Sequence, residues 1–441
     1  MEITGANSVS SGTSPASIDY PLAAFVAIAT TLTLKAEVFL VCLGTYALCF
    51  VALKGRAWAS DAIATIDRNV AGFCAALMAI WFYGALLGWY MGWPRGHVMR
   101  NFFGLALFLP FLPLVATLSH GRDVWRSIAF AGLVSLSVLL ALRLGTVVGV
   151  LGYEDFGNLG IPVGASEYGL RIYSFGLLLG ISTECLLVLR LFEAIGKLNW
   201  RKATWAGAKV IAVLAVISFV GDSKGISLAA GLALFTPILL SRPLSTHIRY
   251  LPIALFLLWG HLVIVPQTTS HVAGFLAPKK NPDFGIILRE AQKGEKSELT
   301  YESSRAPSSA AIFDETALGN QIRYEQFRQL VSDWRFFGRG LGAPISSGYA
   351  RPGEFKYGFE LSYINLIHKL GVVALAYFGF ILYSIYKVAF SSISPQEKYV
   401  AFSCLCYLVP SLGNPILFAA QLVLLHVLAL HVATRYAHGA Q

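Results

Sequence analysis

The sequence predicts an all-α polytopic membrane protein with about twelve transmembrane helices and one large extracytoplasmic loop between spans nine and ten. Hydrophobic residues make up 56% of the chain and charged residues 13%, and the mean hydropathy is +0.63. Apolar runs long enough to cross a bilayer recur along the whole chain. One polar interval interrupts them. We therefore expect nine spans in 1–266, an outer loop with short helices in 267–358, and three spans in 359–441.

The expected spans follow from the apolar runs in chain order. The first 18 residues are polar and rich in serine, without the basic start and small-residue cleavage site of a secretory signal, so we expect them to be retained. Three breaks, at Lys35–Glu37, Gly221–Gly225 and Gly413–Pro415, could be re-entrant bends instead of loops. The runs are 20–34, 37–53, 69–92, 101–119, 127–149, 172–192, 207–221, 224–241, 250–266, 362–387, 399–412 and 414–434.

The basic residues of the short loops predict the orientation. Counted in alternate loops, thirteen Lys and Arg fall on one side and five on the other. Because cytoplasmic loops carry the excess of basic residues, both termini are expected in the cytoplasm and the long loop outside. That is the periplasm if the source is a Gram-negative bacterium. The formal charge of +10 is spread over these loops, so membrane topology explains it and no nucleic-acid partner is expected.

The cysteines and other metal-ligating residues predict no metal site and no cofactor. All six cysteines lie in apolar runs, where a free thiol usually acts as a small packing residue. No His, Cys, Asp or Glu cluster has metal-ligand spacing, and no nucleophile elbow is present.

The second half of the outer loop predicts a short helix lying across the outer surface. Arg323 falls near the edge of its apolar face and can point toward the membrane, where its guanidinium fork suits a phosphate. The alternative is an arginine that faces solvent or lipid headgroups. Arg328, Arg335, Arg339 and Arg351 are weaker candidates for the same anion. The apolar face consists of Ile322, Phe327, Leu330, Val331 and Trp334.

The glycine run GRGLG at 338–342 is interpreted as a tight turn. It resembles a nucleotide-binding glycine motif, but it follows an expected helix instead of a strand and lies outside the cytoplasm. We expect it to bring backbone amides toward the site.

The start of the tenth span predicts an acid–base site. Glu360 lies between Phe359 and Leu361, where desolvation should raise the pKa of a carboxyl unless a cation compensates, as a general base near neutral pH requires. The alternative is a structural pair with an arginine. Tyr363 and Asn365 should line the same opening, with Tyr357 just before it. His368 lies about 12 Å further along the helix and is expected to be an interior histidine.

Other basic residues are expected at the same outer surface. Lys224 follows a bend beside Asp222 and is either a second cation for an anionic ligand or an interfacial lysine. Arg143 and Arg171 flank the segment that joins the fifth and sixth spans outside. Charges near membrane depth are costly and usually functional, so their gathering on one face favours a site there.

These pieces, in this order, resemble the O-antigen polymerase and ligase superfamily. They are SKG at 223–225, Arg323 with YEQF, GRGLG at 338–342 and FELSYINLIHKLG at 359–371. The resemblance implies a fold similar to the multi-spanning glycosyltransferases that use lipid-linked sugars. It also implies a glycan donor on undecaprenyl pyrophosphate, with Lys224 and Arg323 on the pyrophosphate. Ligases typically have His where this chain has Glu360, so the E-x-x-Y-x-N-L pattern looks more like the polymerases.

The expected function is therefore a metal-independent polymerase of O-antigen or exopolysaccharide in the bacterial inner membrane, with its site facing the periplasm. Its partners would be the lipid-linked oligosaccharide, membrane lipid and, as an option, a chain-length regulator. An O-antigen ligase acting on lipid A–core and an anionic-solute transporter remain alternatives. The expected catalytic residues are Glu360 and Arg323, the pyrophosphate-binding residues are Lys224, Arg323, Arg328, Arg339, Arg143 and Arg171, and the acceptor-binding residues are Tyr363, Asn365 and Tyr357.

Overall fold

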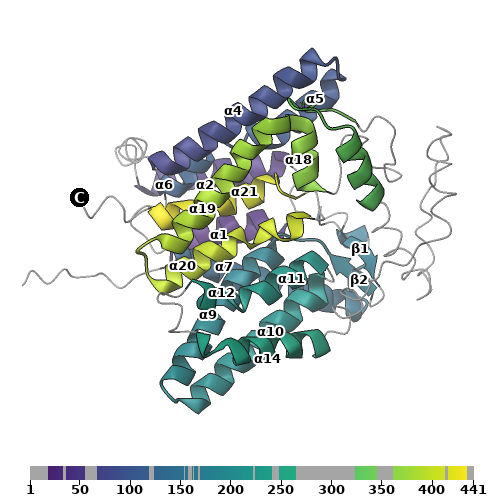
Figure 1. Ribbon diagram of the computed structural model, residues 1–441. Coiled ribbons are helices and arrows are strands. Elements are labelled where there is room, and N and C mark those ends of the chain that lie inside the picture. The colour runs from purple at the N-terminus through teal and green to yellow at the C-terminus, as the bar shows by residue number, and fades with distance from the viewer. Residues whose placement is uncertain are drawn as a thin grey trace, which may run out of the picture.

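The protein is helical throughout most of the part that the computed structural model describes (Figure 1). One antiparallel hairpin departs from the expected all-helical class. In it Val163 of strand β1 (Val163–Ser166) pairs with Ile172 of strand β2 (Gly169–Ile172). The described residues are 18–32, 36–54, 67–118, 124–152, 154–156, 161, 163–166, 169–221, 224–240, 248–264, 323–344, 361–412 and 416–434.

The helices follow the hydropathy of the chain. In order they are α1 (Tyr20–Thr31), α2 (Ala36–Lys54), α4 (Arg68–Tyr90), α5 (Arg95–Ala106), α6 (Leu112–Leu118), α7 (Val124–Val147), α9 (Gly176–Gly196), α10 (Trp200–Gly221), α11 (Lys224–Ala233), α12 (Thr236–Leu239), α14 (Leu251–Ile264), a helix at 323–332, α18 (Ser362–Leu370), α19 (Ala374–Phe390), α20 (Pro395–Leu405) and α21 (Ala420–Thr434). Three short 3-10 turns complete the set: η1 (Gly371–Val373), η2 (Cys406–Leu408) and η3 (Pro410–Leu412).

Among the described residues, four helical stretches are long and apolar enough to cross a membrane, which marks the chain as a membrane protein. They are Arg68–Tyr90, Val124–Val147, Trp200–Gly221 and Ser362–Phe390. The total of about twelve spans stays a prediction. The last stretch is bent at Gly371, which has a φ of +58°, and α18 and α19 lie at a steep angle to one another (Figure 1).

Proline interrupts two of the apolar runs. The run at 101–119 divides into α5 and α6, with turns at 107–111 around Pro110. The run at 399–412 leaves the α-helix at Leu405 and continues as 3-10 turns near Pro410. Proline has no N–H and its ring clashes with the preceding turn, so neither run continues as one regular helix.

Helix α9 is the centre of one half of the molecule. It packs against α7, α10 and α20, and most of its residues are buried. In the other half, α21 packs against α4, α19 and α20 and is buried along its whole length. A helix that is apolar and buried on all sides belongs to the middle of a bundle. Of the five described free cysteines, Cys42 is half-buried and the others are fully buried in this core.

A non-helical segment, 336–343, lies between α4 and α18; we call it the glycine-rich segment. Leu341 N–H donates to the Gly84 carbonyl at 2.8 Å, which joins the segment to α4. Gly340 N–H donates to the Lys369 carbonyl at 2.8 Å, which joins it to the end of α18. The segment therefore links two helices that are far apart in the sequence.

Glycine makes this close approach possible. Gly340 has a φ of +84°, and a Cβ there would lie against the backbone of Gly88 in α4. Gly338 has a φ of +80°, and its Cβ would lie against the backbone at Lys369 and Gly371. Because L-residues rarely adopt this φ and no space exists for a side chain, these positions require glycine.

At the opposite end of α4, the Asp67 side chain caps the helix and also holds the end of α21. Its Oδ1 accepts from Asn69 N–H at 2.9 Å, and its Oδ2 accepts from the Thr434 hydroxyl at 2.7 Å and lies 3.2 Å from His431 Nδ1. Burial favours a raised pKa for Asp67, but the hydrogen bonds from His431 and Thr434, the charge of His431 and the Asn69 amide outweigh it, and the pKa falls to about 2.

Replacing Gly340 by alanine should destabilise the protein. A non-glycine residue at positive φ costs about 1–3 kcal/mol, and the contact with Gly88 adds to this cost. We expect a lower apparent melting temperature in detergent and loss of the monodisperse peak in size-exclusion chromatography. Gly104→Ala is the matched control, because a Cβ at Gly104 meets nothing within 4 Å. Equal melting temperatures for the two variants would contradict the close contact.

Asp67 should make stability depend on pH in the acid range. Its carboxyl has a pKa of about 2 in the folded protein against 3.8 ordinarily, so the native state is stabilised by about 2 kcal/mol above that ordinary value. This contribution is lost as the pH falls through about 2. Asp67→Asn should therefore melt below the wild type at neutral pH, and the gap should narrow in acid. A gap that is constant from about pH 6 to about pH 2 would be the contrary result.

Candidate functional site

The described elements that carry the predicted site residues lie on one side of the molecule. Helix α18, the helix at 323–332 and the β1–β2 hairpin all face the right of the view in Figure 1. The ends of α4 and α21 held by Asp67 belong to the other side. With the orientation expected from the basic residues, the first side is the outer one.

The helix at 323–332 agrees with the short helix that the apolar spacing predicts, but it turns a different face inward. Gln326 and Leu330 are buried, and Arg323 is half-buried on the same side. Positions three and seven residues apart share a helix face, so Arg323 belongs to the buried face. The expected apolar face is wrong in part, because Phe327, Val331 and Trp334 are exposed and only Leu330 is buried. Ile322 lies outside the described residues.

A buried charge cluster follows this helix. The Asp333 carboxylate forms an ion pair with the Arg339 guanidinium through Oδ1, and Oδ2 lies 3.1 Å from His368 Nε2. The Arg339 and Asp333 side chains are only 11% and 15% exposed, so the charges are largely removed from water. Arg339 also lies over the ring of Trp93, 5.3 Å from its centroid. A desolvated cation gains from the face of an aromatic ring.

A second polar contact reinforces the cluster from α5. Lys369 Nζ donates to Asn101 Oδ1 at 2.7 Å, and the same oxygen accepts from Gly342 N–H at 3.4 Å. Trp93 Nε1 donates to the Arg339 carbonyl. The Asn101 and Trp93 side chains thus bind the glycine-rich segment, and Lys369 connects Asn101 to the end of α18.

The first turns of α18 present two of the predicted acceptor-binding residues. The Tyr363 hydroxyl donates to the Leu408 carbonyl at 2.8 Å, so this side chain is fixed on η2. Asn365 is half-buried, and its Oδ1 is buried without a hydrogen-bond partner in the described part of the chain. A buried carbonyl oxygen left in this way is costly unless a ligand or water satisfies it.

Three further predicted residues gather at the neighbouring helix ends. Arg143 is buried near the end of α7, its Cζ 4.9 Å from the centroid of the Phe219 ring of α10. Arg171 is in β2, which packs on α7 and α10. Lys224 is the first residue of α11. Helices α11 and α18 both contact η3, which brings this group and the α18 group into one region.

Some predicted positions lie outside the described residues. These are Glu360, Tyr357, Arg351 and Asp222, and the side chains of Arg171 and Lys224 are not described either. Arg328 is exposed and 3.4 Å from Glu325 on its own helix. Arg335 is exposed on the turn after it.

Sequence reasoning missed Asp333, Trp93, Asn101 and Lys369. The available signal was that Asp333 and Arg339 flank an aromatic turn at the return toward the membrane, where an isolated charge is expensive. The predicted interior position of His368 agrees with its burial, with Asp333 beside it. Arg339 is engaged by the protein itself, which indicates a positioning role more than direct contact with an anion.

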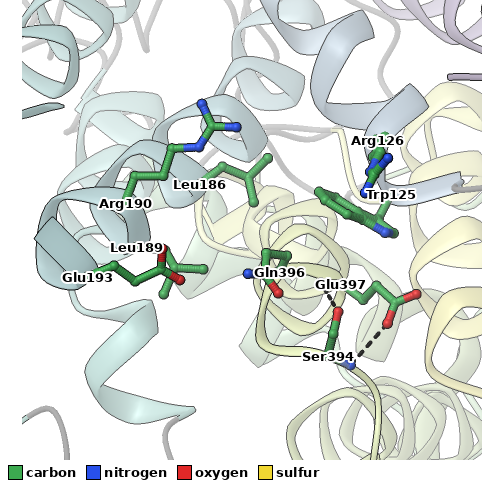
Figure 2. A pocket seen from close by; sticks show the side chains of 9 residues that line it. All are labelled: Trp125, Arg126, Leu186, Leu189, Arg190, Glu193, Ser394, Gln396 and Glu397. Atoms are coloured by element: carbon green, nitrogen blue, oxygen red, sulfur yellow. Dashed lines mark hydrogen bonds between the residues drawn. The ribbon is translucent and has the colours of Figure 1, made fainter. Parts of the chain in front are cut away.

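A cavity of about 490 Å³ lies at the opposite end of the bundle, between α7, α9 and α20. Figure 2 shows the guanidinium groups of Arg126 and Arg190 on different walls, with Glu193, Gln396 and Glu397 between and below them. Glu397 takes part in the capping box of α20 with Ser394. None of the predicted site residues lines this cavity.

No family model matches the chain, and no curated protein matches it either. Among the described residues no group of three or more His, Cys, Asp or Glu is placed to hold a metal ion.

The Asp333–Arg339 pair should be strongly coupled in a double-mutant cycle. Asp333→Asn or Arg339→Gln leaves one buried charge without its partner, which typically costs about 3–5 kcal/mol. The double variant should lose much less than the sum, as measured by chemical unfolding in detergent. Arg328→Gln is the control, because its side chain is 63% exposed and such surface pairs contribute at most about 1 kcal/mol. Strict additivity would show that the two side chains do not interact.

Proposed function

We propose that this protein is a metal-independent glycosyltransferase that polymerises a bacterial surface polysaccharide from polyprenyl-pyrophosphate-linked glycans at the outer face of the inner membrane. The observation that carries the proposal is the coupling of the Arg323 helix to α18. The Asp333–Arg339–His368 cluster joins them, and α18 bears the unsatisfied oxygen of Asn365. A guanidinium for a phosphate and an acceptor for a hydroxyl group are thereby held in one unit.

The donor is activated before it arrives. No nucleotide sugar is expected outside the cytoplasm, so the leaving group must be a pyrophosphate that is already attached to the glycan. In the proposed reaction the acceptor sugar hydroxyl attacks C1 of the donor glycan, and the bond from C1 to the pyrophosphate oxygen breaks. Fixed cations can stabilise the charge that develops on this leaving group. Arg323 and Lys224 take this role.

The proton of the acceptor hydroxyl passes to Glu360, which stands two residues before the start of α18 in the sequence. The Asn365 Oδ1 accepts a hydrogen bond from the same sugar and orients it. Tyr363, fixed on the Leu408 carbonyl, and Tyr357 contribute to the acceptor side. The products are the extended glycan on its lipid and free polyprenyl pyrophosphate, so the reaction balances without a metal or a redox partner.

The remaining arginines divide by environment. Arg328 is exposed and reaches the solvent side of the donor. Arg171, near Lys224, extends the cationic surface toward the hairpin, and the buried Arg143 lies beneath it near the end of α7. Arg339, held by Asp333 and Trp93, positions the glycine-rich segment on which the site is built.

Loss of Arg323 or Glu360 should abolish polymerisation without unfolding the protein. We expect Arg323→Ala to reduce the rate about 100-fold or more, Arg323→Lys to restore part of it because lysine lacks the guanidinium fork, and Glu360→Gln to reduce it about 100- to 10,000-fold. The assay incubates purified protein in lipid nanodiscs with a polyprenyl-pyrophosphate-linked repeat unit and resolves products by size. Arg201→Ala, an exposed position at the opposite end of α10, is the control.

Each product pattern decides between activities. A ladder of longer glycans on the same lipid supports the polymerase. Transfer only after addition of lipid A–core would identify a ligase instead. Normal ladders from correctly inserted Arg323→Ala and Glu360→Gln proteins would overturn the proposed site. No product under any condition, together with uptake of an anionic solute into proteoliposomes, would replace the enzyme with a transporter.

A further inference from the structure

The glycine-rich segment lies beside the outer part of α4, from Tyr83 to Gly88. Leu341 N–H bonds to the Gly84 carbonyl, and the Tyr83 hydroxyl bonds to the Phe337 carbonyl, both at 2.8 Å. Gly84 is six residues before the end of α4 at Tyr90, which is about 9 Å along a helix. The 23 residues of α4 measure about 34 Å, close to the roughly 30 Å of a bilayer core. The segment is therefore at the depth of the outer leaflet.

Much of the backbone of the segment is paired with protein groups. The N–H groups of Gly338, Arg339, Gly340 and Leu341 donate to carbonyls of Arg335, His368, Lys369 and Gly84, respectively. The carbonyls of Phe336 and Phe337 accept from Val372 N–H and from the Tyr83 hydroxyl. Non-helical backbone at this depth is tolerated only where protein groups replace water in this way. The pairing of these groups is therefore compatible with a position at membrane depth.

Two phenylalanines of the same segment point away from the protein. The Phe336 and Phe337 side chains are 57% and 64% exposed, and their rings meet edge to face with centroids 5.0 Å apart. Helix α4 exposes Phe82, Leu86 and Trp89 at similar levels, on its face away from Gly84 and Gly88. Exposed apolar side chains gathered in this way mark a membrane or partner contact. Their position beside α4, an apolar helix long enough to cross the bilayer, favours lipid.

We infer that Phe336 and Phe337 form a wedge inserted among the acyl chains of the outer leaflet. The segment 336–343 is then a re-entrant element of the membrane domain and not part of the aqueous loop. The buried Asp333–Arg339 pair lies at its start and supplies the rigid base from which the two rings project. This inference concerns the contact with bulk lipid and does not depend on the proposed reaction.

The test is photo-crosslinking of the full chain in a defined bilayer. A diazirine derivative of phenylalanine replaces Phe336 or Phe337 in separate proteins, reconstituted in nanodiscs of phosphatidylethanolamine and phosphatidylglycerol. After irradiation, mass spectrometry of the tryptic peptide reports what the carbene has captured. Phe82 is the lipid-facing reference on α4, and Lys202, exposed on the first turn of α10, is the aqueous reference.

We expect the peptides at 336 and 337 to gain the mass of one phospholipid, as at Phe82, and to keep the diacylglycerol part after phospholipase C treatment. Addition of water, as at Lys202, would overturn the inference. Capture of the headgroup alone would also overturn it, because the rings would then lie at the surface. A crosslink to this chain or to a second copy would show that protein covers the wedge and would equally reject the lipid contact. The substituted side chain is close in shape to phenylalanine, and its use at two separate positions keeps the test valid if one variant fails to fold.

Discussion

The architecture depends on one requirement, which is that irregular backbone placed between apolar helices must find all its hydrogen-bond partners in protein. The N–H groups of residues 339–341 meet it by bonding to the Gly84 carbonyl on one side and to the carbonyls at the end of α18 on the other. These bonds require the two backbones to approach closely, which explains why glycine is present on both sides of the contact, at Gly340 and Gly88. The positive φ of the glycines and the small residues on α4 are two results of the same requirement.

The buried Asp333–Arg339 ion pair aligns the elements around it. Two opposite charges rarely gain stability from burial alone, because desolvation offsets their attraction. What Asp333 and Arg339 provide is alignment, since the pair also contacts His368 of α18 and the Trp93 ring. The helix that bears Arg323 is thereby held at a defined position over α18. A site assembled from a loop and a membrane helix needs such a reference point, because loops are otherwise the least constrained part of a fold.

The parts of this structure that were predictable are those encoded by local pattern. Hydropathy located helices such as α4, α7 and α10, and apolar spacing located the helix at 323–332. Pairings between distant positions were not predictable, because hydropathy carries no information about partners. Nothing local to Arg339 shows that it pairs with Asp333 and covers Trp93, about 250 residues earlier. The break at Gly371 was also missed, since an apolar run reads the same whether or not the chain turns within it. For the site, the sequence singled out Arg323, Tyr363 and Asn365 as candidates, whereas the cluster that joins their two helices required coordinates.

Both ends of α4 are bonded by residues that are synthesised long after α4 itself. Its first turn is held by Thr434, 367 residues later in the chain, and its outer half receives Leu341 only after most of the polypeptide has been made. During biogenesis α4 must therefore wait in the bilayer with its glycine face and its Asp67 carboxylate uncovered. Late-closing contacts of this kind make assembly slow and expose the nascent protein to quality control. The bond between Asp67 and Thr434 can form only after α21 has been inserted, so the start of α4 is completed by a helix from the far end of the described chain.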